Sequence, residues 1–218
     1  MRILLFVLFI THYTANSQIS EVSDVEALEL LENIHTEYQS YDTHRFVFDM
    51  TIKYPEKEGD SYSGTLIQGG DKFSLDMGDR QIISDTETIW VFHKNRNEVE
   101  LNDADFGEDS GILTPSDIFQ LYKSDKYLFA LGNYVTVNGQ GATEVECKPL
   151  DRNSEYSKIR LIVSQKTNTI ASAKLFYKDG SRLIMDLKEH NKGYTVTASN
   201  FTFDENLHPG VTIEDLRF

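Results

Sequence analysis

The 218-residue chain has one cysteine, one tryptophan and four prolines. With Cys147 as the only cysteine, no disulfide can form within the chain, so an apolar core must stabilise the fold. Cys147 lies in an alternating stretch and is expected to be a small buried side chain. Basic residues are also few, 21 against 35 acidic residues, which gives a formal net charge of −14. That balance argues against nucleic acid or anionic lipid headgroups as partners.

Motifs for catalysis, metals and cofactors are lacking as well. The serine beside a glycine at Ser63-Gly64 lacks the second glycine that a nucleophile turn requires. No two histidines have the i, i+4 spacing of a zinc pair, so His35 and His93 are expected to be packing or surface residues. The acidic loop Asn102–Asp109 does not match the ligand spacing of a calcium loop. We therefore expect no cofactor, no metal site and no enzyme, although a hidden pair of catalytic carboxylates stays open.

An uninterrupted apolar run from Ile3 to Ile10 follows the positive start Met1-Arg2. It is too short to span a bilayer and precedes small residues at Ala15 and Ser17, which predicts a signal peptide over residues 1–17. A retained membrane anchor is the alternative interpretation. Residues 18–218 should then form one soluble, exported domain, since the chain shows no repeat and no low-complexity linker.

Short strands with abrupt turns are predicted from Gly64 to Leu101. In Lys72–Met77 every second residue is apolar, which places Phe73, Leu75 and Met77 on one face of an extended chain. A sheet that is apolar on one face and polar on the other must have its apolar face covered.

Two helices are predicted from the sequence. In Val22–Tyr38 apolar residues, Ile34 among them, recur every three or four positions, with Ser23 and Glu26 as an expected capping box and Val22 stapled against Ala27. The second is a short helix over Ile118–Lys123 that contains Phe119.

Strands return in the second half of the chain. Alternating patterns over Lys158–Val163, Thr169–Tyr177 and Leu183–Leu187 indicate strands, and Lys178–Ser181 indicates a hairpin turn. Tyr194–Phe203 also alternates, but with a change of phase, for which a bulge near Asn200 or a change of partner sheet would account.

Several of these segments together resemble the outer-membrane lipoprotein carrier proteins of Gram-negative bacteria, the LolA-like family. The resemblance covers most of the chain after residue 17 and depends on the order and spacing of five segments: Lys72–Met77, Ile82–Phe92, Thr114-Pro115, Asn200–Phe203 and Pro209–Asp215.

The resemblance implies a mainly β fold with α, an unclosed and strongly curved antiparallel β-barrel whose concave face is covered by helices. It also implies a monomeric periplasmic carrier that takes triacylated lipoproteins from an inner-membrane ABC transporter and delivers them to the outer membrane, with an acceptor protein there possible. The lipid-binding residues would be those of the concave face: Ile34, Phe73, Leu75, Met77, Phe119, Leu175 and Met185.

Two departures from the family pattern concern the turns. The family has a basic residue and a proline where this chain has Gly69-Gly70, and that basic residue helps to hold the helical lid closed, so lid closure must differ here or be looser. Thr86 stands where the family has a turn glycine.

Other functions remain compatible with the same apolar lining. A regulatory module that senses mislocalised lipid or lipoprotein, a carrier of another amphiphile such as a glycolipid, and a periplasmic lipid hydrolase are the alternatives. An ordinary packed core is the structural alternative for the lining residues.

Overall fold

The computed structural model describes residues 22–104, 125–137 and 139–217. In this part of the chain twelve strands form one sheet, in the order β12-β6-β5-β4-β3-β2-β1-β11-β10-β9-β8-β7. The elements are α1 (Val25–Gln39), β1 (Thr43–Lys53), β2 (Asp60–Gly69), β3 (Lys72–Met77), β4 (Arg80–Ser84), β5 (Thr88–His93), β6 (Glu98–Asp103), β7 (Tyr127–Val137), β8 (Gln140–Pro149), β9 (Tyr156–Ser164), β10 (Thr169–Tyr177), β11 (Arg182–Lys192), η3 (Ala198–Phe201), η4 (Glu205–Leu207) and β12 (Thr212–Asp215).

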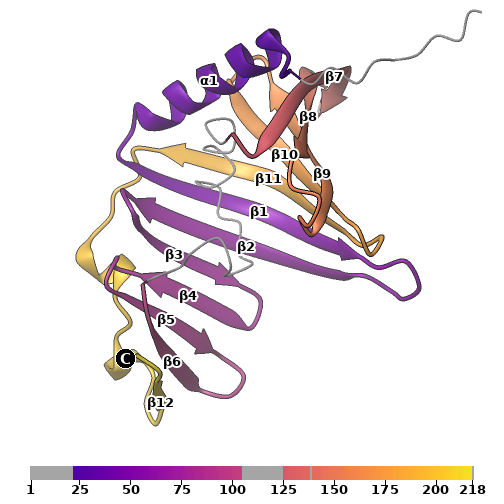
Figure 1. The fold of residues 1–218 in the computed structure, drawn as a ribbon. Helices are drawn as coiled ribbons and strands as arrows, with labels where there is room; N and C mark the ends of the chain where they lie inside the picture. Colours follow the sequence, from indigo (N-terminus) through magenta and orange to yellow (C-terminus); the bar gives the residue numbers. More distant parts are fainter. Residues whose placement is uncertain (1–21, 105–124, 138, 218) are drawn as a thin grey trace, which may run out of the picture.

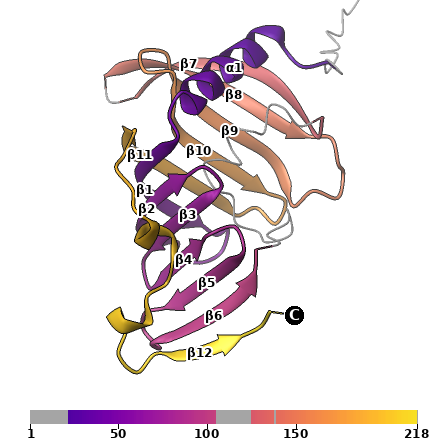
Figure 2. The same ribbon diagram turned by 90° about the vertical axis from the view of Figure 1, so that its left-hand side faces the viewer.

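Two antiparallel meanders make up the sheet. Strands β1 to β6 form one and β7 to β11 the other, and they join where β1 pairs with β11. Only β12 is parallel to its neighbour, β6. The sheet is strongly curved and its edges, β7 and β12, do not meet (Figures 1 and 2). The expected unclosed antiparallel half-barrel is therefore confirmed.

The helix α1 lies over one end of the curved sheet (Figure 1). It begins later than the sequence pattern suggested, because Asp24, not Ser23, is the N-cap and accepts a hydrogen bond from the Glu26 amide at 3.0 Å. The Ser23 hydroxyl instead accepts a hydrogen bond from the Phe129 amide in β7. The expected staple is also wrong, since Val22 is 74% exposed.

The stretch Tyr194–Phe203, predicted as a strand with either a bulge or a change of partner sheet, needs another correction. Residues Ala198–Phe201 form the 3-10 helix η3, whose Asn200 side chain accepts a hydrogen bond from the Thr197 amide. The change of phase in the sequence marks this helical turn rather than a bulge. It lets the C-terminal segment pass along the outside of β3 and β4, towards β12 (Figure 2).

A glycine allows a close contact between two strands of the sheet. Gly64 lies opposite Phe48, and a Cβ at position 64 would be only 2.4 Å from the ring of Phe48. The Phe48 ring can therefore lie flat across β2 only because residue 64 is glycine.

Two sequence predictions fall partly or wholly in other parts of the chain. The short helix Ile118–Lys123 lies outside the described residues. In the acidic stretch, Asn102 and Asp103 end β6, and residues 105–109 also lie outside the described residues. No helix in the described ranges is both long and apolar enough to cross a membrane.

Candidate functional site

The face of the sheet that bears α1, here called the concave face, has a continuous apolar cluster. Its buried members are Ala27, Leu31, Ile34, Phe46, Phe48, Leu66, Leu75, Ile82, Ile89, Phe129, Val145, Cys147, Ile159, Leu161, Val163, Ile170, Ala173 and Leu175. We call this set, with the partly buried apolar residues packed against it, the concave cluster. It contains residues of α1 and of strands from both meanders. It is larger than the second apolar cluster of the described chain, whose buried members are Ile83, Phe92, Val99 and Phe203.

The residues predicted to bind lipid come together in this cluster. Ile34, Leu75 and Leu175 are buried in it, whereas Phe73, Met77 and Met185 are partly buried and pack against it. The seventh, Phe119, lies outside the described residues. The six described residues therefore belong to one cluster, while Phe119 and the role of all seven in binding stay predictions.

The region of the cluster on β1, β3 and β11 contains several of its partly buried members. Met50 of β1 lies directly opposite Met185 of β11. Ile52, two residues further along β1, lies opposite Leu183. Met77 pairs with Gly64, which itself faces Phe48. Unbranched, polarisable methionine side chains can adapt to ligands of different shape. This region is therefore an apolar surface that can repack.

One end of α1 is attached to β7. The Asp24 amide donates to the Phe129 carbonyl at 2.7 Å, and the Asp24 carboxylate accepts from the Leu131 amide at 3.4 Å. These bonds fix the start of the helix to the edge strand of the sheet.

The other end of α1 is attached to β1, β2 and β11 by a polar group that we call the latch: Glu37, Tyr38, His44, Gln68, His190 and Lys192. The Tyr38 ring stacks on His44 with centroids 4.2 Å apart, and its hydroxyl donates to Gln68 Oε1. Glu37 forms an ion pair with Lys192. The helix is thus tied to three strands by polar contacts that water or a ligand could replace.

Two histidines at the centre of the latch hydrogen-bond to each other. His44 Nε2 lies 3.0 Å from the Tyr41 carbonyl, which only accepts, so this nitrogen bears the proton. His44 Nδ1 then accepts from His190 Nε2 at 3.0 Å. This direction of the hydrogen bond holds while His44 is neutral, because a proton on Nδ1 would make that nitrogen a donor.

The surroundings of these histidines favour the neutral form. Burial lowers the pKa of His190 to about 4, and the nearby His44 and Lys192 add to the effect. Burial also lowers the pKa of His44. The latch is therefore intact at neutral pH and is weakened by acid.

One residue of the latch lies beside Gly69-Gly70. Gln68, the residue just before this pair, accepts the hydrogen bond from Tyr38 and donates to the Gly70 carbonyl at 3.2 Å. An amide on β2 thus contacts the helix near the point where the family has its basic residue.

Sequence reasoning missed the histidine pair, since His44 and His190 are 146 residues apart. One signal was available, because His44 is in phase with Phe46 and Phe48, the inward-facing residues of β1. A histidine in phase with buried aromatics is expected to be buried and partnered.

Catalytic and metal-binding groups are sparse among the described residues. Glu98, Glu100 and Glu214 place one carboxylate oxygen each within 4.8 Å of the others, but Arg96 and His93 already pair with Glu100. The Cys147 thiol is buried, and burial raises its pKa to about 12, so it is not a nucleophile at neutral pH. The apolar concave cluster is the more prominent candidate site.

Comparison with known proteins agrees with this geometry. The family model described as outer membrane lipoprotein carrier protein LolA matches residues 48–204. No curated protein matches the chain.

Solved structures show similarity of fold. An uncharacterized conserved protein from Thermus thermophilus has a TM-score of 0.58 at 7% identity, over 87% of this chain and 99% of that one. A DUF1329 family protein from Desulfovibrio piger has a TM-score of 0.46 at 14% identity, over 81% and 96%. A LolA superfamily protein from Nitrosomonas europaea has a TM-score of 0.42 at 15% identity, over 81% and 97%.

Proposed function

Because the chain belongs to the outer membrane lipoprotein carrier protein LolA family, we propose that it carries the acyl chains of lipoproteins on its concave apolar face. The observation that supports this most is the partial exposure of Phe73, Met77 and Met185, which all pack against the concave cluster. Apolar side chains that the protein's own core does not cover offer a surface to a hydrocarbon ligand.

The energetics of acyl chains explain why a carrier is needed. Each methylene that leaves water is worth about 0.8 kcal/mol, so three long chains cannot cross an aqueous compartment at a useful rate without protection. The carrier must also release its ligand, and a surface with several methionines binds hydrocarbon without close shape complementarity.

The wider role that we propose follows the family. Residues 1–17 are removed as a signal peptide, and residues 18–218 act as a single soluble domain in the periplasm. An inner-membrane ABC transporter loads the protein, which works as a monomer and without enzymatic activity, and the outer membrane receives the cargo, with or without an acceptor protein.

Native mass spectrometry of the protein extracted gently from its own periplasm tests this role. We expect a species whose mass equals the mature protein, beginning near Gln18, plus a triacylated lipoprotein. Bound glycolipid would replace the proposed cargo with another amphiphile. Protein that is never found with an acylated ligand, even after incubation with a triacylated peptide, would contradict the proposal.

A further inference from the structure

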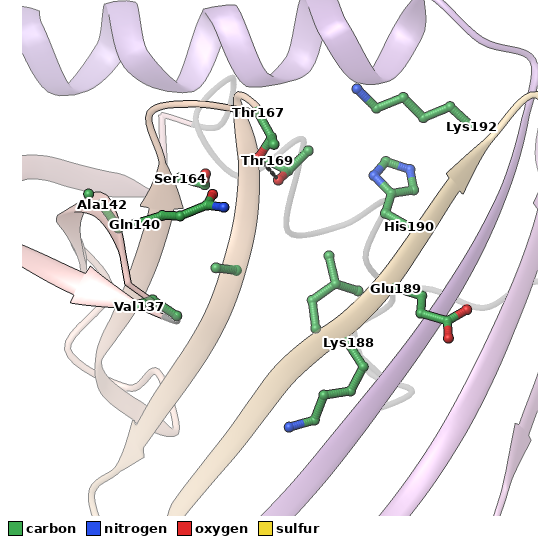
Figure 3. Close-up of a pocket in the computed structure, with 13 residues that line it drawn as sticks. Val137, Gln140, Ala142, Ser164, Thr167, Thr169, Lys188, Glu189, His190 and Lys192 are labelled. Carbon is green, nitrogen blue, oxygen red and sulfur yellow. Dashed lines mark hydrogen bonds between the residues drawn. The ribbon is translucent and has the colours of Figure 1, made fainter.

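A cleft separates β10 from β11 below α1 (Figure 3). These two strands pair only where Ser172–Phe176 lies opposite Arg182–Asp186. The start of β10, from Thr169, and the end of β11, to Lys192, diverge from each other. The cleft between them has a volume of about 380 Å³, within the range of small ligand sites.

One wall of the cleft is a strand edge that has no strand partner among the described residues. In an antiparallel sheet the main-chain groups of a strand point alternately to its two neighbours. From Leu187 to Lys192, β11 pairs with β1 on one side, and its other side faces the cleft. Such an edge can bind an extended peptide by adding a strand.

Apolar and polar side chains both line the cleft, with Val137, Ala142, Ala171 and Leu187 as the apolar ones, and the charged side chains among them are paired. Lys192 pairs with Glu37, Glu189 lies 3.2 Å from Arg45, and Lys188 lies 3.2 Å from Asp49. The opposite wall supplies hydroxyls and an amide, from Ser164, Thr167, Thr169 and Gln140 (Figure 3). This lining disfavours an anionic headgroup and suits the neutral polar groups of a peptide main chain.

The inner end of the cleft adjoins the concave cluster. Leu187 lines the cleft and also packs against that cluster. The ring of His190, another lining residue, stacks on Phe46 of the cluster with centroids 4.2 Å apart. A ligand with an apolar end and a peptide end could therefore occupy both sites at once.

We propose that the cleft binds the extended peptide segment that follows the acylated residue of the cargo, through strand pairing with Leu187–Lys192 of β11. This inference rests on the proposed function, in which the acyl chains occupy the concave face. The polypeptide attached to those chains must leave the apolar region, and the cleft offers a polar route lined by main-chain hydrogen-bonding groups.

Two ligands test the proposal: a triacylated cysteine amide, and the same triacylated cysteine followed by a short uncharged peptide. We expect the mature protein to bind the lipopeptide about tenfold more tightly, as a few main-chain hydrogen bonds would give after the cost of ordering. A lipopeptide N-methylated at its second and third residues has fewer main-chain donors and should lose this preference.

A variant that fills the cleft provides the second measurement. Ala171→Trp places a large ring among the lining residues and should abolish the preference for the lipopeptide while leaving affinity for the cysteine amide unchanged. Thr136→Trp is the matched control, an exposed position in β7 that does not line the cleft, and should behave like the unmodified protein.

The outcomes separate the two proposals. If neither ligand binds, the proposed function itself is wrong. Equal affinity for the two ligands, or an equal loss of both in Ala171→Trp, would overturn the peptide site alone. As a readout independent of folding, a photoreactive second residue in the lipopeptide should crosslink to β10 and β11, and crosslinks confined to β3–β5 would also overturn the site.

Discussion

The sheet has an apolar cluster on each face, and the two are covered in different ways. On the convex face Ile83, Phe92 and Val99 are buried together with Phe203, which comes from the C-terminal segment. On the concave face Phe73, Met77 and Met185 remain partly exposed. Strand β4 contributes to both clusters, because Ile82 belongs to the concave cluster and the adjacent Ile83 to the convex one.

The two clusters therefore have different expected roles, one in packing and the other in ligand binding. The convex cluster has Ile83, Phe92, Val99 and Phe203 as its buried members, and Trp90, Leu101 and Val211 are partly buried against them. Phe203 comes from the C-terminal segment, so the chain itself covers the buried part, and this burial stabilises the fold at all times. The concave cluster keeps Phe73, Met77 and Met185 partly exposed, so further burial of these side chains requires a ligand or a movement of the chain. Substitutions in the convex cluster should therefore change the stability of the fold, whereas substitutions of the partly exposed concave side chains should change ligand binding.

The largest effect on stability is expected from Phe203→Ala. Removing a buried ring from the convex cluster should lower the free energy of unfolding by about 3–5 kcal/mol. Urea unfolding measures this change, and titration of the folded variant with a fluorescent acyl probe should give the affinity of the unmodified protein. Loss of probe binding with little loss of stability would mean that the two faces are not distinct in function.

Acid should weaken the latch, which contains His190. The unfolded state takes up protons on histidine near pH 6.5, whereas His190 in the folded state does so only near pH 4. The unfolded state therefore binds more protons in this interval, and stability falls as the pH is lowered from about 6.5 to about 4. The expected loss is on the order of 2 kcal/mol, after allowance for screening by water.

His190→Gln is the control for the acid effect, because its amide can still donate to His44 Nδ1 but does not titrate. Glu37, Lys192, Tyr38 and Tyr41 also face the histidine pair, and all four are unchanged in this variant. Urea unfolding at pH 7 and pH 4.5 should show a smaller acid loss in the variant. An identical loss would show that other groups, not His190, are responsible.

The smallest effect concerns the turn between β4 and β5, the strands that contribute to both clusters. Thr86 has a φ of +83°, a region that β-branched residues disfavour. Thr86→Gly should raise the free energy of unfolding by about 0.5–1 kcal/mol, because relief of strain exceeds the added chain entropy. Probe affinity should not change.

Asn168→Gly is the matched control for the turn variant. Asn168 also has a positive φ, +47°, but asparagine tolerates this region, so the substitution should be close to neutral. Equal stabilisation by both changes would indicate a general effect of glycine rather than strain at Thr86.

Much of this arrangement follows from local sequence pattern. The alternation of Phe73, Leu75 and Met77 indicated one shared face, and family-specific segments indicated the curved sheet, because both signals are confined to short stretches. The latch and the cleft could not be predicted in this way. They depend on the pairing of β1 with β11 and on the point at which β10 and β11 diverge, and no local pattern encodes contacts between such distant segments.

The Tyr194–Phe203 error has a similar cause. Alternation within a few residues resembles a strand, but η3 forms because the Asn200 side chain caps the turn and because Phe201 and Phe203 bury their rings against the sheet. Tertiary packing decided the conformation there.

A carboxylate placed on each face tests the central claim most directly. Phe73→Glu changes the partly exposed concave surface, and Phe92→Glu is its matched control in the closed convex cluster. For each variant, thermal unfolding and acyl-probe affinity are measured together. We predict that Phe73→Glu melts close to the unmodified protein but binds the probe at least about a hundredfold more weakly, since an unpaired charge against hydrocarbon costs several kcal/mol. Phe92→Glu should lose about 3 kcal/mol or more of stability. Early melting of Phe73→Glu would indicate an ordinary closed core, and unchanged probe affinity would contradict a lipid site on this strand.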